Sequence, residues 1–158
     1  MLESKLTRKE ELIYLAGFFD GEGCICLSKR SYPKSKGYTF RVICTCVNAN
    51  PKPIFRLQQL FGGSKVSKRL PNKGTMFAYY WQIEAHKAFL FLKTLLPYLI
   101  VKKEEAELAI LFQEARKNLG RRKTMEELAV EEAQHMLMKN LKRGEVKTDG
   151  VRNLEQVS

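Results

Sequence analysis

The spacing of apolar residues in the first part of the chain predicts one helix followed by two strands. Residues 8–20 have a helical pattern, and Thr7 with Glu10 forms the capping box that starts such a helix. From Gly23 onward apolar and polar residues alternate, first in the run that precedes the loop SYPKSKG and then over YTFRVICTCVN. Alternating runs joined by a short loop predict an antiparallel hairpin.

The rest of the chain repeats this order of elements. A short helix is expected over residues 53–61, ended by Gly62 and Gly63, and a second hairpin over residues 64–85 around the turn PNKG. Three further helices are expected at residues 86–96, 102–119 and 124–143, the last with a capping box of Thr124 and Glu127. Helices packed on one antiparallel sheet of about four strands define an α+β fold.

The chain of 158 residues is strongly basic, with 28 lysines and arginines against 17 acids and a formal net charge of +11. Such an excess favours a polyanionic partner, most often nucleic acid, although a merely basic protein has the same composition. No apolar run reaches the length of about 18 residues that a membrane span needs. Because the first residues are polar rather than a signal peptide, we expect an intracellular protein of a reducing compartment, in a prokaryotic cytoplasm or an organelle.

The cysteines form two C-x-C pairs, Cys24 with Cys26 and Cys44 with Cys46. Zinc sites more often use the wider C-x₂-C spacing, which lets both thiolates reach one ion. Each pair also lies in an apolar, strand-like run. This setting favours free thiols in strands over a metal site.

Two acids, Asp20 and Glu22, stand at the end of the first predicted helix. A helix C-terminus carries partial negative charge and unpaired carbonyl oxygens, so carboxylates are unfavourable there. The placement becomes favourable when a hard cation binds, because Mg²⁺ takes oxygen ligands. From this pattern alone a solvated surface acid in a turn is the favoured interpretation of Glu22, and a metal site is the alternative.

The stretch LAGFFDGEG, residues 15–23, resembles the signature of the LAGLIDADG homing endonucleases. Phe18 and Phe19 replace two apolar positions of that signature, Gly21 replaces a small residue, and Glu22 stands at its second acid. The order of elements also resembles the αββαββα core of the family, over about residues 10–119. The resemblance implies a homing-endonuclease-like core over residues 1–120 with a four-stranded, DNA-binding antiparallel sheet. It leaves a C-terminal helix at 121–145, packed on the core or near DNA, and a frayed tail at 146–158.

The resemblance implies which residues form the metal site. Glu22 takes the position of the metal ligand, and the backbone carbonyl of Gly21 is a second possible ligand. The family metal is Mg²⁺, and other divalent cations such as Mn²⁺ or Ca²⁺ can occupy such a site. Asp20 matches the first acid of the signature, which resembles a structural position. We expect its carboxylate to make local hydrogen bonds at a turn.

Two further catalytic residues are expected from the same resemblance. Lys102 follows a Leu-Pro-aromatic-Leu run, as the active-site lysine of the family does, and fits that position better than Lys103. Asn48 resembles the position that holds Gln or Asn and orders solvent near the metal. Asn50 is an alternative, because an Asn-Pro step also suits a turn.

The polar face of the predicted sheet is expected to contact DNA, because a two-stranded ribbon fits the major groove. Arginine is the natural bidentate reader of guanine, whereas lysines in loops more often meet phosphates. A solvated strand face is the alternative for any single residue, and the faces of Tyr79 and Trp81 stay open. The residues expected to contact DNA are Ser28, Arg30, Tyr32, Lys34, Lys36, Thr39, Arg41, Thr45, Lys65, Ser67, Lys68 and Arg69.

The chain carries one signature where the family uses two, so the resemblance implies a homodimer with a near-palindromic DNA site. Its helix seam is expected at Leu12, Ala16, Gly17 and Asp20. The implied function is an intron-encoded, sequence-specific endonuclease that makes a staggered double-strand break by divalent-metal-assisted hydrolysis. The alternatives are a non-cleaving protein such as an intron maturase, which would bind intron RNA, and a basic DNA-binding regulator. Glu22 and Lys102 favour the nuclease, because binding alone needs neither.

Overall fold

The structure is a computed structural model, and it describes residues 5–32, 34, 37–70, 76–116 and 123–144. The elements are α1 (Arg8–Glu22), β1 (Gly23–Ser31), β2 (Tyr38–Asn48), α2 (Pro51–Phe61), β3 (Ser67–Arg69), β4 (Ala78–Glu84), α3 (Ala85–Leu95), the 3₁₀ helix η1 (Leu96–Tyr98), α4 (Lys103–Ala115) and α5 (Met125–Arg143). This order confirms the α+β fold that the apolar spacing predicts. The expected contact at Lys36 and the expected tail at 146–158 lie outside the described residues.

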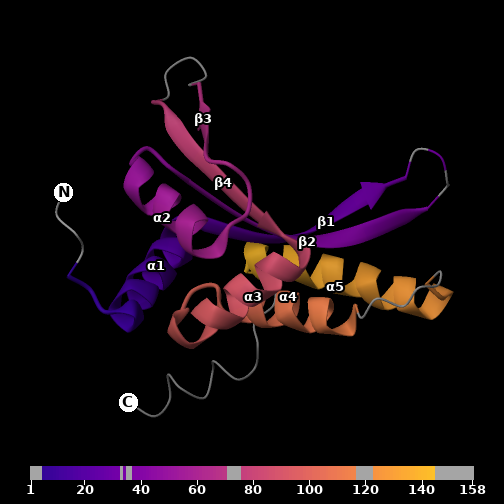
Figure 1. The fold of residues 1–158 in the computed structure, drawn as a ribbon. Coiled ribbons are helices and arrows are strands. Elements are labelled where there is room, and N and C mark those ends of the chain that lie inside the picture. The colour runs from indigo at the N-terminus through magenta and orange to yellow at the C-terminus, as the bar shows by residue number, and fades with distance from the viewer. Residues whose placement is uncertain (1–4, 33, 35–36, 71–75, 117–122, 145–158) are drawn as a thin grey trace, which may run out of the picture.

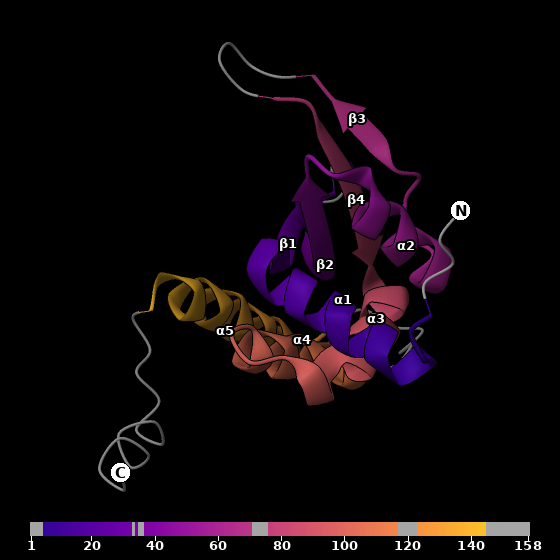
Figure 2. The ribbon, with the colours of Figure 1, turned by 90° about the vertical axis from the view of Figure 1, so that its left-hand side faces the viewer.

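The strands form one antiparallel sheet in the order β1-β2-β4-β3. Figure 1 shows two arms rising from the helices: β1 and β2 form one, and β4 and β3 form the other. Helices α1, α3, α4 and α5 lie along one face of the sheet, and α2 flanks the arm of β3 and β4; Figure 2 shows the same arrangement from the side. The opposite face of the sheet is left open between the arms.

The core lies between the helices and one face of the strands. Alternate strand residues supply it, among them Ile25, Phe40, Val42, Trp81 and Ile83, each at most 1% exposed. On the helix side an aromatic cluster surrounds one ring: Phe91 packs edge-on against Phe19, Phe61 and Trp81, with centroids 5.0, 4.8 and 5.3 Å away. Burying such rings stabilises the fold both through area and through these edge-to-face contacts.

The two aromatic residues whose face the sequence leaves open both lie on the helix side. Trp81 is fully buried and its Nε1 donates to the carbonyl oxygen of Gly62 at 2.7 Å, so its polar atom is satisfied. Tyr79, two residues earlier in the same strand, shares this face and packs against Phe55 of α2, with ring centroids 6.3 Å apart. Neither ring is therefore part of the open face.

The helix starts agree with the capping signals, but α4 ends at Ala115 rather than at the predicted residue 119. Both predicted capping boxes are present, at Thr7 with Glu10 and at Thr124 with Glu127. The first helix continues two residues beyond the predicted end, because Gly23 enters β1 directly and its N–H caps the carbonyl of Phe19. Helix α5 packs on the sheet through Met138, which is 2% exposed. No helix among the described residues is long and apolar enough to cross a membrane.

The junction between β4 and α3 is strained. Ala85 has φ +51°, and it is the only non-glycine residue with positive φ in the described part of the chain. A Cβ disfavours this region, so Ala85→Gly is expected to stabilise the fold by about 0.5–1 kcal/mol. Ala88→Gly, at a fully buried position of the same helix, is the matched control and should destabilise it. Thermal unfolding measures both; a lower melting temperature for Ala85→Gly would contradict the strain.

Candidate functional site

The tip of α1 presents an exposed carboxylate beside unpaired backbone oxygens. Glu22 is the last residue of the helix and is exposed, and no basic residue stands in the last turn. Two of the four terminal carbonyls have partners: that of Phe19 accepts from the Gly23 N–H, and that of Asp20 accepts from Lys102. The Gly21 and Glu22 carbonyls remain at the tip, where a helix offers no partner of its own.

The carboxylate of Asp20 binds a segment that is far from it in the sequence. Its Oδ2 accepts from the N–H groups of Ile100 at 2.7 Å and Val101 at 3.2 Å, and its Oδ1 accepts from that of Lys102 at 3.0 Å. These amides form the turn that leads from η1 into α4, and Lys102 is the N-cap residue of α4. Asp20 therefore fixes this turn from a different helix. Asp20 thus has the hydrogen-bonding function that we favour for it, but its partner Ile100 lies 80 residues away in the sequence rather than in a local turn.

Asp20 binds Lys102 at two places. The Nζ of Lys102 donates to the Asp20 carbonyl oxygen at 2.5 Å, in addition to the contact of the Lys102 backbone with the Asp20 carboxylate. The ammonium thus supplies the positive charge that a helix C-terminus favours. The expected catalytic lysine is half-buried and lies at the end of α1, the helix whose last residue is Glu22.

The charges of Glu22 and Lys102 both act on the thiol of Cys46. The pKa of this thiol is raised to about 12, mainly by burial and also by the charge of Glu22, while the charge of Lys102 acts in the opposite direction. Both charged groups are thus close enough to act on one buried sulfur. Because metals bind thiolates, the raised pKa of Cys46, like that of the buried Cys44, disfavours these thiols as ligands.

The structure separates the two asparagines at the end of β2. Asn50 is the N-cap of α2 and its Oδ1 accepts from the Lys52 N–H at 3.0 Å. Asn48 ends the strand, and its Oδ1 accepts from the Asn50 N–H at 2.8 Å, which leaves its amide nitrogen as the group able to donate elsewhere. Asn50 has a structural function, so Asn48 stays the better candidate for contact with solvent.

The donor set at the tip fits a hard cation. A carboxylate and helix-end carbonyls are the oxygen ligands that Mg²⁺ and Ca²⁺ take. In the described part of one chain, however, no three His, Cys, Asp or Glu side chains cluster where they can hold a metal. One chain therefore offers Glu22 and the Gly21 carbonyl, and further ligands have to come from water, a substrate or another chain.

The expected dimer seam is partly wrong. Ala16 is fully buried, Leu12 packs against the core, and the Asp20 carboxylate binds the start of α4, so these three residues face their own chain. Only Gly17 of the four is exposed, and a Cβ built on it meets nothing within 4 Å. The exposed stripe of α1 consists instead of Ile13, Tyr14, Gly17 and Gly21. Ile13 and Tyr14 are 46% and 55% exposed, which is a large apolar exposure for one helix face.

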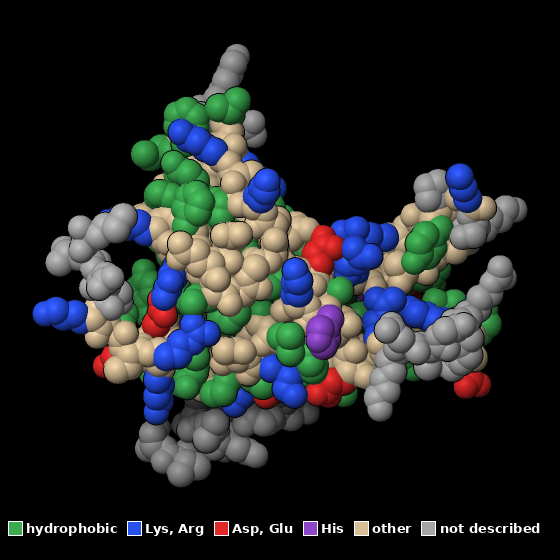
Figure 3. All heavy atoms as spheres, in the orientation of Figure 1, with side chains coloured by type: hydrophobic (Ala, Val, Ile, Leu, Met, Phe, Trp, Pro, Cys, Tyr) green, Lys and Arg blue, Asp and Glu red, His purple; other side chains and the backbone are tan. Residues whose placement is uncertain are grey.

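Half of the residues expected to contact DNA share the open face of the sheet, namely Ser28, Arg30, Arg41, Thr45, Ser67 and Arg69. Register places Ser28 opposite Arg41 and Cys24 opposite Thr45, while Arg69 pairs with Ala78 beside Ser67. Figure 3 shows basic side chains along both arms and in the hollow between them. Lys68 alternates with Ser67 and Arg69, so it points to the helix side, where its Nζ lies 4.3 Å from the Phe77 ring centroid. Tyr32, Lys34 and Lys65 are exposed in the connections.

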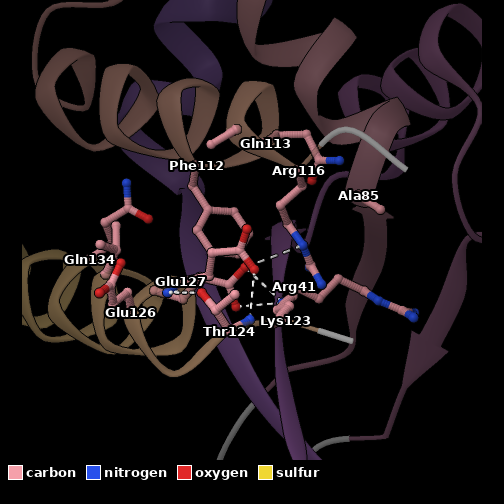
Figure 4. A pocket seen from close by; sticks show the side chains of 13 residues that line it. Arg41, Ala85, Phe112, Gln113, Arg116, Lys123, Thr124, Glu126, Glu127 and Gln134 are labelled. Atoms are coloured by element: carbon pink, nitrogen blue, oxygen red, sulfur yellow. Dashed lines mark hydrogen bonds and ion pairs between the residues drawn. The ribbon is translucent and has the colours of Figure 1, made fainter. Parts of the chain in front are cut away.

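Thr39 is not accessible as expected. It is 8% exposed, and its Oγ1 accepts from Nη2 of Arg116 at 2.8 Å. Arg116 in turn lies 3.6 Å from the carboxylate of Glu131, which pairs with Lys123 at 2.6 Å. Figure 4 shows Arg116 and Lys123 converging in a cavity of about 780 Å³ between α4, α5 and β2, whose wall also includes Arg41. This buried charge cluster joins α5 to the sheet and takes Thr39 out of the open face.

Glu84 is a charged residue of the open face that the sequence analysis did not identify. Glu84 ends β4 and binds both Arg30 and Arg41. At the end of this strand apolar residues, Trp81 and Ile83, alternate with polar ones, Gln82 and Glu84. This alternation predicts that Glu84 lies on the open face.

Comparison with known proteins places this fold. No protein-family model and no curated protein matches the sequence. Among solved structures, the homing endonuclease I-CvuI in complex with an I-CreI target is 23% identical, over 89% of this chain and 87% of that one, with a TM-score of 0.69. The archaeal intron-encoded homing endonuclease I-Vdi141I, complexed with DNA, is 14% identical over 85% and 86% of the two chains, with a TM-score of 0.71. The homing endonuclease I-TnaI is 21% identical over 84% and 93%, with a TM-score of 0.59. The chain thus has the LAGLIDADG homing endonuclease fold, as the resemblance of residues 15–23 implies.

Proposed function

We propose that the chain is a homodimeric, sequence-specific DNA endonuclease that hydrolyses both strands of a near-palindromic site with a divalent metal. The observation that carries this is the exposed carboxylate of Glu22 at the tip of α1, beside a stripe of small and apolar residues on the same helix. The DNA complexes of similar folds, solved with Ca²⁺ or Mg²⁺ in the case of I-CvuI, support a DNA partner and a divalent cation.

The residues at the tip suit metal-assisted hydrolysis. Glu22 and the Gly21 carbonyl would hold Mg²⁺, which when bound polarises a phosphate and lowers the pKa of a bound water. Lys102 places an ammonium beside this group and can stabilise negative charge that develops on the phosphate. Asp20 holds Lys102 in place from both ends, through its side chain and its backbone oxygen.

A second copy of the chain would complete the site. The stripe of Ile13, Tyr14, Gly17 and Gly21 lies next to Glu22, and glycines let two helix backbones approach closely. Ile100 and Val101, held at the α1 tip by Asp20, are 85% and 75% exposed and extend this apolar surface. Packing two such surfaces around a two-fold axis would bring both Glu22 side chains together.

The dimer seam can be tested separately from the fold. Gly17→Leu adds a side chain where the chain itself offers open space, so the monomer should keep its stability or gain up to about 1 kcal/mol from better helix propensity. The same side chain should weaken the dimer at least about a hundredfold, because it keeps the two helices apart. Sedimentation measures the association. Lys139→Leu, at an exposed position of α5, is the matched control and should leave the dimer intact.

The proposed activity is tested with purified protein and a library of long duplexes, with and without Mg²⁺. Double-strand cleavage at a defined site only in the presence of metal is the expected result. Tight RNA binding without metal-dependent nicking would overturn the nuclease and favour a splicing role.

A further inference from the structure

A hydrogen-bonded chain of side chains crosses the open face of the sheet. At its centre the Glu84 carboxylate accepts from Arg30 Nη2 at 3.0 Å and from Arg41 Nη1 at 2.8 Å, one arginine from each strand of the first hairpin. Gln82 donates to the same carboxylate, and the hydroxyl of Tyr80 donates to Gln82. The guanidinium of Arg69 lies 3.8 Å from the Tyr80 ring centroid, so the chain reaches β3.

The carboxylate of Glu84 does not cap the helix that follows it. Glu84 is the N-cap residue of α3 but makes no side-chain cap, so its carboxylate serves the arginines instead of the helix. The next residue is the strained Ala85, which turns the chain at this point. Strain of this kind persists where surrounding contacts fix the backbone.

Glu84 stays charged under the conditions in which DNA binds. Its side chain is 26% exposed, and desolvation alone would raise its pKa, but the bond from Arg41 and the charges of Arg30 and Arg41 lower the pKa overall. In Figure 3 acidic and basic side chains adjoin one another in the hollow between the arms. A carboxylate there is repelled by phosphates, so it weakens general attraction to DNA.

The carboxylate changes what the two arginines can do. A free arginine on a DNA-facing surface neutralises any nearby phosphate, regardless of sequence. An arginine held through one terminal nitrogen keeps its remaining donors in a fixed direction, and guanine is the base that accepts two of them, at O6 and N7. Holding the fork in advance also lowers the entropy cost of forming that contact.

We propose that Glu84 is a specificity-determining residue that holds Arg30 and Arg41 for guanine recognition and keeps them from serving as general phosphate contacts. The inference rests on the proposed binding of DNA by the open face, but not on cleavage. Arg30 and Arg41 are the base readers, and Glu84 positions them.

The test is a binding selection from a duplex library randomised along its whole length, sequenced for the wild type and for Glu84→Gln. The wild type is expected to enrich guanine at two positions of each half-site. In Glu84→Gln this preference should fall at least about fivefold, because good bidentate contacts discriminate by about this much or more. Glu132→Gln is the matched control: it removes one acid from an exposed pair with Lys29 and should leave the base preference unchanged.

Arg41→Lys provides a second readout that does not depend on the folding of the Glu84 variant. Lysine keeps the charge but cannot form the planar two-donor contact, so the guanine preference should fall at one position per half-site. A folded Glu84→Gln protein with wild-type base preferences, or wild-type sites without guanine preference, would overturn the inference while leaving DNA binding in place. If the wild type selects no duplex at all, the proposed function itself fails with it.

Discussion

Glu22→Gln is expected to abolish cleavage while DNA binding persists. Glutamine keeps the size of the side chain but removes the negative charge with which the exposed α1 tip would hold a cation. Loss of such a ligand should lower the cleavage rate at least about a hundredfold, in line with the cost of weakening metal sites and preorganised charges. The measurement is single-turnover cleavage of the selected duplex, together with its dissociation constant in Ca²⁺.

The control for this variant is Glu107→Gln, which removes an exposed carboxylate from α4. It should cleave at the wild-type rate, so that a general effect of charge on DNA binding is separated from the effect at the tip. Cleavage by Glu22→Gln within a few fold of the wild-type rate would show that this carboxylate does not hold the metal.

Asp20→Asn is expected to have its largest effect on stability. The carboxylate accepts three backbone N–H groups in the turn before α4, and an amide replaces one of its two acceptor oxygens with a donor. Losing part of this charge-assisted set should reduce the free energy of unfolding by about 2–4 kcal/mol. Thermal or urea unfolding measures the change. Cleavage should fall as well, because Lys102 loses its fixed position.

The neighbouring acid is the natural comparison for Asp20. Glu22→Gln should unfold within about 0.5 kcal/mol of the wild type, because substitutions of exposed side chains away from buried contacts cost little. The two acids of the motif are thus expected to have different functions: Asp20 stabilises the fold, and Glu22 is needed for cleavage. Equal stability of Asp20→Asn and the wild type would contradict the structural role of Asp20 at the turn before α4.

Patterns of neighbouring residues predict much of the fold, because helix starts and strand alternation depend on residues close together in the sequence. Capping boxes at Thr7 and Thr124 and the switch from helical to alternating spacing at Gly23 place the element boundaries within a few residues. Alternation also gives the correct face for Ser28, Arg41 and Thr45. These features depend only on residues near one another in the chain.

Features set by tertiary packing were not predictable in the same way. Ala16 and Gly17 are neighbours and both small, but one faces the core and the other faces outward, which depends on where α3 packs. The Asp20 contact with Ile100 joins residues 80 positions apart. Thr39 has the correct alternation for the open face, yet Arg116 from the end of α4 covers it. Periodicity gives relative orientation within an element, and the partner of each face comes from the whole fold.

The central claim is that two Glu22 carboxylates, one from each copy, act together on one DNA site. A mixed dimer of wild-type and Glu22→Gln chains, purified through two different tags, tests it most directly by the rate of double-strand cleavage. We expect this rate to fall at least about a hundredfold, leaving a nicked duplex or an uncut one, because one of the two sites lacks its ligand. A mixed dimer that breaks both strands at the wild-type rate would contradict the claim.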